Sequence, residues 1–275
     1  MFKDEVHNFL KINQIIFEEN PSFSFFDTYF LPQHKLYLHL ISLQKFQVSN
    51  INIYYFQSLS EQQNAQGNRI IHLWEDVWNV QKSLVQSRIL SMIGVFKRLN
   101  ARHCFIERIN KPTADIFLSD NHLQGNVKAK FKYGLFLKPQ YVEKYLANIS
   151  ITKQLIAVAT FSGGRLMTEG DRKDSRSYEL IRFASLQGYV VVGGMGKLLK
   201  AFVAEHNPDD IMSYADCDWS DGRSYETLGF ARIGRIEPHF FLLDIPTFKR
   251  YSIRENRGNS IKIFNAGSIK FIRRK

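Results

Sequence analysis

The sequence predicts an α+β fold made of two modules, residues 1–106 and 107–275. Two observations predict this fold. In the second half, short apolar strands alternate with helical patterns around one glycine-rich turn, at Val190–Phe202. In the first half, several strand candidates precede a long helical pattern, and the pattern changes near Glu107–Pro112. With 275 residues, 44% of them hydrophobic, the chain is long enough to bury two cores.

The first module is predicted to be rich in strands and closed by a helix. Phe25–Leu43 indicates two apolar strands around a Pro-Gln turn, and Asn50–Phe56 is a third strand candidate. Arg69–Trp74 is a fourth strand candidate. In Glu75–Lys97 apolar residues recur at helical spacing, which predicts one long helix.

The second module is predicted to begin with an antiparallel meander. A loop and the start of a helix at Ser119–Gly125 precede a strand at Tyr133–Lys138. A strand at Gln154–Phe161 should pair with it. The charged, glycine-containing stretch Gly163–Ser177 then indicates a loop before a strand at Tyr178–Ala184.

The glycine-rich turn is a candidate anion site. A β-branched strand, Tyr189–Val192, leads through three glycines into an amphipathic helix. The first turn of a helix has unpaired N–H groups, and glycine lets a ligand approach the backbone closely. We therefore expect a phosphate to bind there, with Lys197 adding a positive charge. The residues of this candidate cofactor site are Val192, Gly193, Gly194, Gly196 and Lys197.

The charge of the chain indicates a polyanionic partner. The net charge is +11, and residues 249–275 hold nine Lys or Arg and one acid, Glu255. Such a segment favours nucleic-acid phosphates, although a solvated, solubilising terminus is the alternative. The candidate nucleic-acid-binding residues are Lys249, Arg250, Arg254 and Arg257.

Other classes of function are not indicated. No run of 18 apolar residues suggests a membrane span, and acids among the first residues do not fit a signal peptide, so we expect a cytoplasmic protein without a membrane partner. Cys104 and Cys217 lie far apart and lack ligand-spaced partners, so we expect neither a disulfide framework nor a metal.

The glycine turn resembles the phosphate-binding motif of the GNAT superfamily of N-acetyltransferases, Q/R-x-x-G-x-G/A. Residues 191–196, VVGGMG, match its glycines at Gly194 and Gly196, and Val191 stands where the family has Gln or Arg. The resemblance implies a GNAT-like mixed sheet and binding of acetyl-CoA or another acyl-CoA. A V-shaped opening between the strands at Tyr189–Val192 and Ile211–Tyr214 that leaves the Gly194 and Gly196 amides unblocked would provide the capacity to bind the cofactor.

A second segment strengthens this resemblance. SYETLGF at Ser224–Phe230 is similar to the family's A-x-x-LYEKLGF signature, in which a helix ends at glycine and a strand follows. By that match Tyr225 would protonate the departing CoA thiolate. A phenol with a pKa of about 10 is a suitable proton donor to a thiolate.

Further phrases are similar to phage Mom DNA-modification proteins and to homing-endonuclease-associated phage proteins. They are NHLQG at 121–125, YELIRF at 178–183 and SYAD at 213–216, and the similarity spans roughly 107–275. Polar residues in these phrases are candidate catalytic groups. We expect His122 or Asp216 to deprotonate or orient an amine, and strand alternation predicts that Glu179 and Arg182 point to opposite faces.

The first module resembles PD-(D/E)XK endonucleases close to the very-short-patch repair enzymes. The match covers RIIHLWEDVWNVQKSLVQSRIL at 69–90 and places Asp27 at the family's first metal-binding acid. His39 falls at the second acidic position, so we interpret this module as a degenerate nuclease. A generic β-rich domain without nuclease ancestry is the alternative.

Three functions follow from these patterns. The first is a GNAT-type acyl-CoA-dependent transferase acting on nucleic acid, at a DNA base amine. The second is a mobile-element endonuclease that uses the first module, for which Asp27 would be essential. The third is a catalytically inert DNA-binding protein. The sequence does not predict the oligomeric state.

Overall fold

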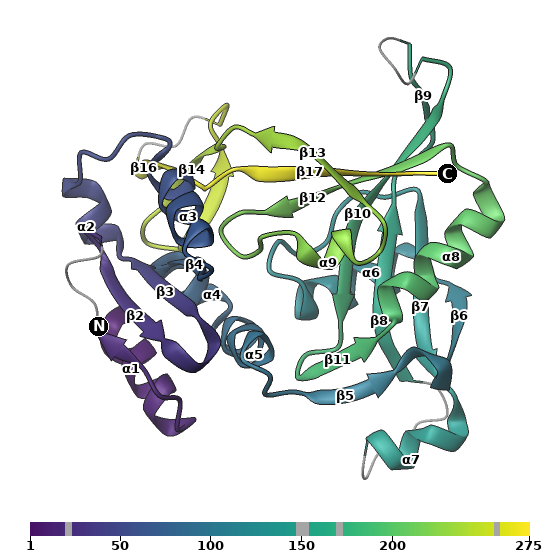
Figure 1. Ribbon diagram of the computed structural model, residues 1–275, viewed down its shortest axis with the longest axis horizontal. Helices are drawn as coiled ribbons and strands as arrows, with labels where there is room; N and C mark the ends of the chain where they lie inside the picture. Colours follow the sequence, from purple (N-terminus) through teal and green to yellow (C-terminus); the bar gives the residue numbers. More distant parts are fainter. Residues whose placement is uncertain (20–23, 147–153, 169–172, 256–258) are drawn as a thin grey trace. The chain divides into compact units, whose positions relative to one another are not determined.

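Figure 1 shows the computed structural model of the chain. It describes residues 1–19, 24–146, 154–168, 173–255 and 259–275. The chain forms two compact units. Unit 1 comprises Met1–Lys82, Tyr214–Glu226 and Arg232–Lys270; unit 2 comprises Ser83–Ser213, Thr227–Ala231 and Phe271–Lys275. The division into modules 1–106 and 107–275 stays a prediction.

Unit 1 contains a four-stranded sheet in the order β1-β2-β3-β4. The first three strands are antiparallel, and β3 runs parallel to β4. All six residues of β3 are buried, because both of its faces are covered. The strands are β1 (Glu18–Glu19), β2 (Asp27–Leu31), β3 (Leu36–Ile41) and β4 (Arg69–Trp74), with the turn η1 (Pro32–His34) between β2 and β3. The strands predicted around the Pro-Gln turn and at Arg69–Trp74 are confirmed.

Two predictions for the first module are wrong. Asn50–Phe56 is not a strand; it leads into α3, where the buried residues Phe56, Leu59 and Gln63 recur at helical spacing. The helix predicted at Glu75–Lys97 is broken at Gln81 and ends at Met92. The helices of this region are α1 (Phe2–Ile12), α2 (Leu43–Val48), α3 (Tyr55–Ala65), α4 (Glu75–Val80) and α5 (Lys82–Met92).

The basic C-terminal segment folds largely into strands rather than a free tail. A three-stranded antiparallel sheet has the order β15-β14-β16. Its strands are β14 (Phe240–Asp244), β15 (Lys249–Ser252) and β16 (Ser260–Phe264), and β17 (Ser268–Arg274) follows. Alternating buried residues such as Ile263 and Phe271 explain why this basic sequence is ordered.

The larger sheet has the order β13-β17-β12-β10-β8-β7-β6, with β9 beside β10. The predicted antiparallel meander is confirmed: β7 pairs with β8, and β8 with β10. β12 is parallel to β10. The strands are β6 (Cys104–Arg108), β7 (Phe131–Leu137), β8 (Gln154–Phe161), β9 (Arg165–Leu166), β10 (Arg176–Ser185), β12 (Asp210–Asp216) and β13 (Ala231–Ile236).

Two helices cover opposite faces of the unit 2 strands. On one face the ring of Phe202, from α8 (Gly194–His206), stacks on Phe161 of β8 at 3.9 Å between centroids. On the other face α6 (Lys111–Asn121) packs Phe117 against Val158 and Ala184. The helix start predicted at Ser119–Gly125 is wrong, because α6 ends there.

The strand before the glycine turn lies outside the large sheet. β11 (Tyr189–Val192) pairs in parallel with β5 (Lys97–Asn100). The opening predicted between β11 and β12 is therefore misplaced, since β12 pairs with β10 instead. The remaining short elements are η2 (Ala101–His103), η3 (Pro139–Tyr141), α7 (Val142–Tyr145) and α9 (Arg223–Glu226). Among the described helices, none is long and apolar enough to cross a membrane.

Candidate active site

The parallel strands β10 and β12 pair over only part of their length. Their ladder joins Ser177–Glu179 to Asp210–Met212, although β10 continues to Ser185. Beyond the ladder, the Ser213 hydroxyl donates a hydrogen bond to the Leu180 carbonyl oxygen at 2.9 Å. The backbone ladder between the two strands thus ends while β10 continues, and ligands commonly bind at the carboxyl ends of parallel strands.

A β-bulge brings Glu179 and Arg182 to one face of the sheet. Leu180 pairs with Phe161, and Arg182 pairs with the adjacent Thr160, so the register shifts between them. Leu180 therefore shares the α8 face with Phe161, whereas Arg182 lies on the α6 face with Thr160. Glu179, next to Leu180, also falls on the α6 face. The prediction of opposite faces for Glu179 and Arg182 is wrong, because strand alternation ignores the extra residue.

The α6 face carries polar groups that affect one another electrostatically. Burial raises the pKa of Glu179, and the charge of Arg182 partly offsets this. Burial, with the charges of Arg182 and Arg88, lowers the pKa of His122 to about 3. Arg182 thus influences both His122 and Glu179, and the structure brings together these three of the five predicted catalytic residues.

This face combines a buried hydroxyl with solvent contact. Thr160 is 1% exposed, and its hydroxyl has no hydrogen-bond partner in the described part of the chain. Ile181, Arg182 and Phe183 are half-buried, although β10 is an interior strand and residues 156–161 of the adjacent β8 are all buried. Because these three residues of an interior strand are partly exposed, a ligand could reach this face of the sheet. Thr160 could not be identified from the sequence, because the residue pattern of β8 is that of an ordinary core strand.

The glycines of the turn are favoured by the backbone conformation and by close packing. Gly193 adopts φ +74°, a left-handed conformation that glycine favours. A Cβ at Gly194 would lie 3.0 Å from Val191 Cγ1, and one at Gly196 would lie 3.2 Å from Leu228 Cδ2. The α8 N-terminus has no side-chain cap among the described residues, so its first amides suit an anion.

Lys197 is engaged within unit 2. Its ammonium group donates hydrogen bonds to the carbonyl oxygens of Ala101 at 2.9 Å and Cys104 at 2.6 Å. Its structural part is therefore to anchor the first turn of α8 to the segment after β5. Val192, by contrast, is 42% exposed. Sequence reasoning could not foresee the role of Lys197, because its acceptors lie more than 90 residues away.

Asp216 and Tyr225, the other predicted catalytic residues, belong to unit 1. An Asp216 carboxylate oxygen accepts a hydrogen bond from the backbone N–H of Asp218 at 3.0 Å. Tyr225 is half-buried in α9, which Gly229 follows at φ +80° before β13 begins. The helix–glycine–strand order of the LGF motif is confirmed, and the catalytic roles stay predictions.

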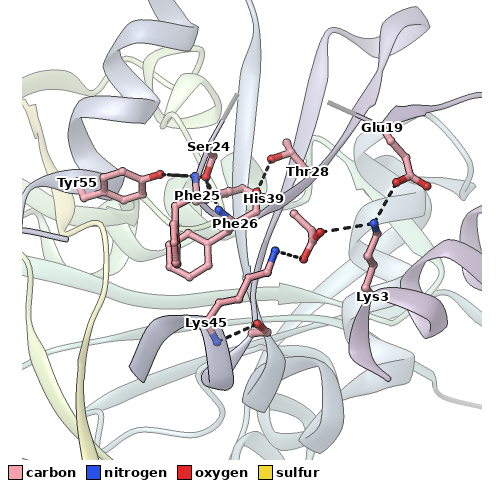
Figure 2. Close-up of polar contacts among 11 residues, drawn as sticks. Lys3, Glu19, Ser24, Phe25, Phe26, Thr28, His39, Lys45 and Tyr55 are labelled. Carbon is pink, nitrogen blue, oxygen red and sulfur yellow. Dashed lines mark hydrogen bonds and ion pairs between the residues drawn. The ribbon is translucent and has the colours of Figure 1, made fainter. Parts of the chain in front are cut away.

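Asp27, the candidate metal ligand, is instead neutralised by lysines. The ammonium groups of Lys45 and Lys3 lie 2.7 and 3.5 Å from its carboxylate oxygens. Figure 2 labels these two lysines. Burial favours the neutral acid, but the hydrogen bond and charge of Lys45, with the charge of Lys3, lower the pKa of Asp27. In the described residues no group of three or more His, Cys, Asp or Glu could hold a metal ion.

His39 does not face Asp27. The residue opposite Asp27 is Leu40, which is buried, whereas His39 lies opposite Thr28 and His72 on the other face of the sheet. The assignment of His39 to the second acidic position of the motif stays a prediction. Both ring nitrogens of His39 form hydrogen bonds. Nε2 bonds the Ser24 hydroxyl at 2.6 Å, and Nδ1 bonds Nδ1 of His72 at 2.9 Å. Figure 2 labels Ser24 and His39.

The candidate nucleic-acid residues of the C-terminal segment differ in availability. Arg250 forms two hydrogen bonds with Asp76, at 2.6 and 2.9 Å, and its side chain is 23% exposed. Its guanidinium is thus engaged inside unit 1. Lys249 and Arg254 are exposed. Arg257 lies outside the described residues.

Comparisons with known proteins give structural similarities only. No family model and no curated protein sequence matches the chain. The solved NatC complex bound to Gag peptide and CoA is similar at 10% identity, over 63% of this chain and 99% of that one, with a TM-score of 0.37. An acetyltransferase of Bacillus subtilis in complex with CoA is similar at 12% identity, over 62% and 99%, with a TM-score of 0.35. The KacTA–DNA complex is similar at 19% identity, over 47% and 86%, with a TM-score of 0.30.

Proposed function

We propose that this chain is a GNAT-type acyl-CoA-dependent N-acyltransferase that acts on nucleic acid, at an amine of a DNA base. One observation carries the proposal: a bulge in the interior strand β10 places the half-buried Glu179 and Arg182 on one face, where its ladder with β12 ends. The glycine turn and α8 follow β10 in the chain, and the LGF motif follows β12. An anion-binding turn and a carboxylate base are two parts that acyl transfer from an acyl-CoA to an amine can use.

The residues of the turn fit a phosphate-bearing cofactor. The backbone amides of Gly194 to Gly196 are uncapped by any described side chain, and Gly193 and Val192 beside them are exposed. These amides would hold the pyrophosphate. Lys197 contributes by fixing the turn through its two carbonyl acceptors. Bound acyl-CoA would supply an acyl group activated as a thioester.

Glu179 is the proposed general base. Its raised pKa makes it a stronger base than an ordinary carboxylate. It would take the proton from the attacking amine nitrogen at a carboxylate oxygen. Arg182, on the same face, stabilises the carboxylate in its charged form.

His122 is better suited to orienting the acceptor than to removing its proton. Its Nδ1 accepts a hydrogen bond from the Gln124 N–H at 3.1 Å, so in the neutral ring Nε2 carries the proton. A pKa of about 3 keeps this ring neutral at physiological pH. His122 therefore offers a donor N–H to the acceptor. Tyr225 is the proposed proton donor to the leaving group, on the strength of the LGF motif.

The cofactor part of the proposal is tested by calorimetry. Titration of acetyl-CoA into the wild-type protein should give saturable binding, and Glu179→Gln should bind equally well because Glu179 acts on the acceptor. Absence of binding at millimolar acetyl-CoA would overturn the transferase.

The endonuclease alternative gains no support from Asp27. Two lysines neutralise its carboxylate, and the buried Leu40 occupies the facing position. Magnesium needs several oxygen ligands, so this arrangement disfavours a metal-dependent nuclease. Cleavage of duplex DNA with Mg²⁺ or Mn²⁺, abolished by Asp27→Ala, would restore it.

A further inference from the structure

Five cations in unit 2 lie on segments that are bonded to one another. We call them the η2–α7 basic surface: Lys97, Arg98, Arg102, Lys138 and Lys144. The N–H of Lys138 donates to the carbonyl oxygen of His103 at 3.0 Å, which joins the start of η3 to η2. The Tyr189 hydroxyl donates to the Tyr145 carbonyl oxygen at 3.3 Å, and Lys97 lies 5.6 Å from the Tyr189 ring centre. β5, β11 and α7 are thereby linked.

His103 forms the rigid centre of this surface. Its ring stacks on Tyr141, with centroids 4.1 Å apart and an angle of 19° between planes. The Arg102 Nε–H donates to His103 Nε2 at 3.2 Å, so Nδ1 carries the proton and donates to the Tyr145 hydroxyl at 2.7 Å. This packing joins η2 to η3 and α7, the segments that carry Arg102, Lys138 and Lys144, so these segments need not be ordered on binding.

The cations of this surface lack carboxylate partners. Within the described parts of the chain, none of the five forms an ion pair, and Glu143 is the single acid in residues 97–103 and 138–145. Burial of His103, with the charges of Arg102, Lys144 and Lys138, lowers its pKa. The local potential is therefore positive, and it falls on four exposed side chains and the half-buried Lys138.

We infer that the η2–α7 basic surface binds the phosphodiester backbone of a nucleic-acid strand. Exposed Lys and Arg without carboxylate partners release counterions from a polyphosphate, and the exposed guanidinium groups of Arg98 and Arg102 match phosphate oxygens. An acidic polypeptide offers carboxylates at lower charge density. The inference rests on the proposed nucleic-acid acceptor and assigns it a docking surface that the sequence had placed on the C-terminal segment.

The test compares two matched triple variants. One is Lys97→Glu/Arg98→Glu/Lys144→Glu, and the control is Lys249→Glu/Arg254→Glu/Lys262→Glu in the β15–β16 segment. All six residues are exposed, and each variant changes the net charge equally. Binding of a fluorescein-labelled 20-nucleotide single strand and of the same sequence as a duplex is followed by anisotropy between 50 and 200 mM NaCl, with circular dichroism melting to verify folding.

The η2–α7 variant should bind at least 10-fold more weakly at 100 mM NaCl. Its slope of log K against log salt should fall by about 2, the value for three lost contacts to a single strand. The control variant should bind within 3-fold of wild type. The single-strand and duplex arms report which form is preferred, and loss of either form by the η2–α7 variant alone supports the inference.

Three outcomes would overturn the inference of a nucleic-acid-binding surface. They are an equal loss of binding in both variants, a loss only in the control variant, and displacement of the oligonucleotide by polyglutamate as readily as by the unlabelled strand. Acetyl-CoA calorimetry on the η2–α7 variant separates the two proposals. Retained cofactor binding with lost oligonucleotide binding in this variant supports the surface. Lost oligonucleotide binding in the variant, together with no acetyl-CoA binding by the wild-type protein, would leave the surface in place and refute the transferase.

Discussion

Asp27 and Glu179 are both carboxylates on strands, and the sequence predicts one as a metal ligand and the other as a catalytic residue. Their surroundings differ. Lys45 and Lys3 contact Asp27 and lower its pKa, whereas burial raises the pKa of Glu179 despite the charge of Arg182. A paired carboxylate is a weak base, and a desolvated one is a stronger base. The balance between burial and counter-charge therefore decides whether a carboxylate forms a stabilising ion pair or acts as a base.

The largest expected effect is on catalysis. Glu179→Gln should lower the rate of acyl transfer by roughly 10²–10⁴-fold, the usual contribution of a general base. Asp27→Asn should change the rate by less than about 3-fold, because its carboxylate is engaged by lysines. Transfer is measured with radiolabelled acetyl-CoA and DNA under saturating conditions. Equal losses in the two variants would remove the distinction.

The pH dependence of the transfer rate should report the protonation of Glu179. The carboxylate form of Glu179 is the active base, so the rate should fall as pH drops through its pKa. Since that pKa is raised, the acid limb should lie above the ordinary Glu value of 4.5. A log kcat/KM profile measures it. An acid limb at or below the ordinary value would count against Glu179 as base.

A third carboxylate, Asp76, extends the comparison to a buried pair. Asp76 is 1% exposed and bonds Arg250 twice. Removing one partner strands a buried charge, so Arg250→Met should destabilise the fold by about 3 kcal/mol. Urea unfolding gives the free energy, and the exposed Arg254→Met is the matched control. A loss no larger than in the control would show that the pair is dispensable.

The buried histidines of unit 1 should make the protein sensitive to acid. Burial lowers the pKa of His72 to about 3 from 6.5 and lowers that of His39 well below 6.5. Their neutral forms stabilise the fold above pH 6.5, and this contribution is lost between about pH 6.5 and 3, with up to one extra proton taken up per histidine on unfolding. Melting temperatures measured across this range should fall, and His72→Gln should flatten the fall.

The smallest expected effect concerns Lys45. Its ion pair with Asp27 is 2.7 Å long, but the lysine side chain is 40% exposed. Screening by solvent limits such a pair to roughly 0.5–1 kcal/mol at pH 7. Because the folded pKa of Asp27 is lowered, this stabilisation should vanish as pH falls through that pKa. Urea midpoints of Lys45→Met at pH 7 and pH 3 measure it.

Local signals predicted the elements around the candidate site better than its geometry. Glycines mark the turn before α8 and the end of the LGF helix, because backbone conformation there excludes most side chains. The bulge between Leu180 and Arg182 depends on how β10 meets β8, so the shared face of Glu179 and Arg182 could not be read from strand alternation.

Long-range partners also escaped the sequence. Asp76 and Arg250 lie 174 residues apart, so the basic C-terminal segment looked more available than it is. The segment KRLNAR at 97–102 is less conspicuous by composition, yet its cations lack carboxylate partners among the described residues. Charge density is visible in a sequence, whereas pairing depends on which strands the fold brings together.

The most direct test of the account measures two products of one reaction. CoA thiol released from acetyl-CoA and acetyl groups incorporated into an oligonucleotide are quantified together for the wild-type protein and for Glu179→Gln. We predict equal amounts of thiol and incorporated acetyl from the wild type, and a loss of both in Glu179→Gln with acetyl-CoA binding retained. Thiol release without incorporation, or equal incorporation by the two proteins, would contradict the claim that Glu179 deprotonates a nucleic-acid amine for acyl transfer.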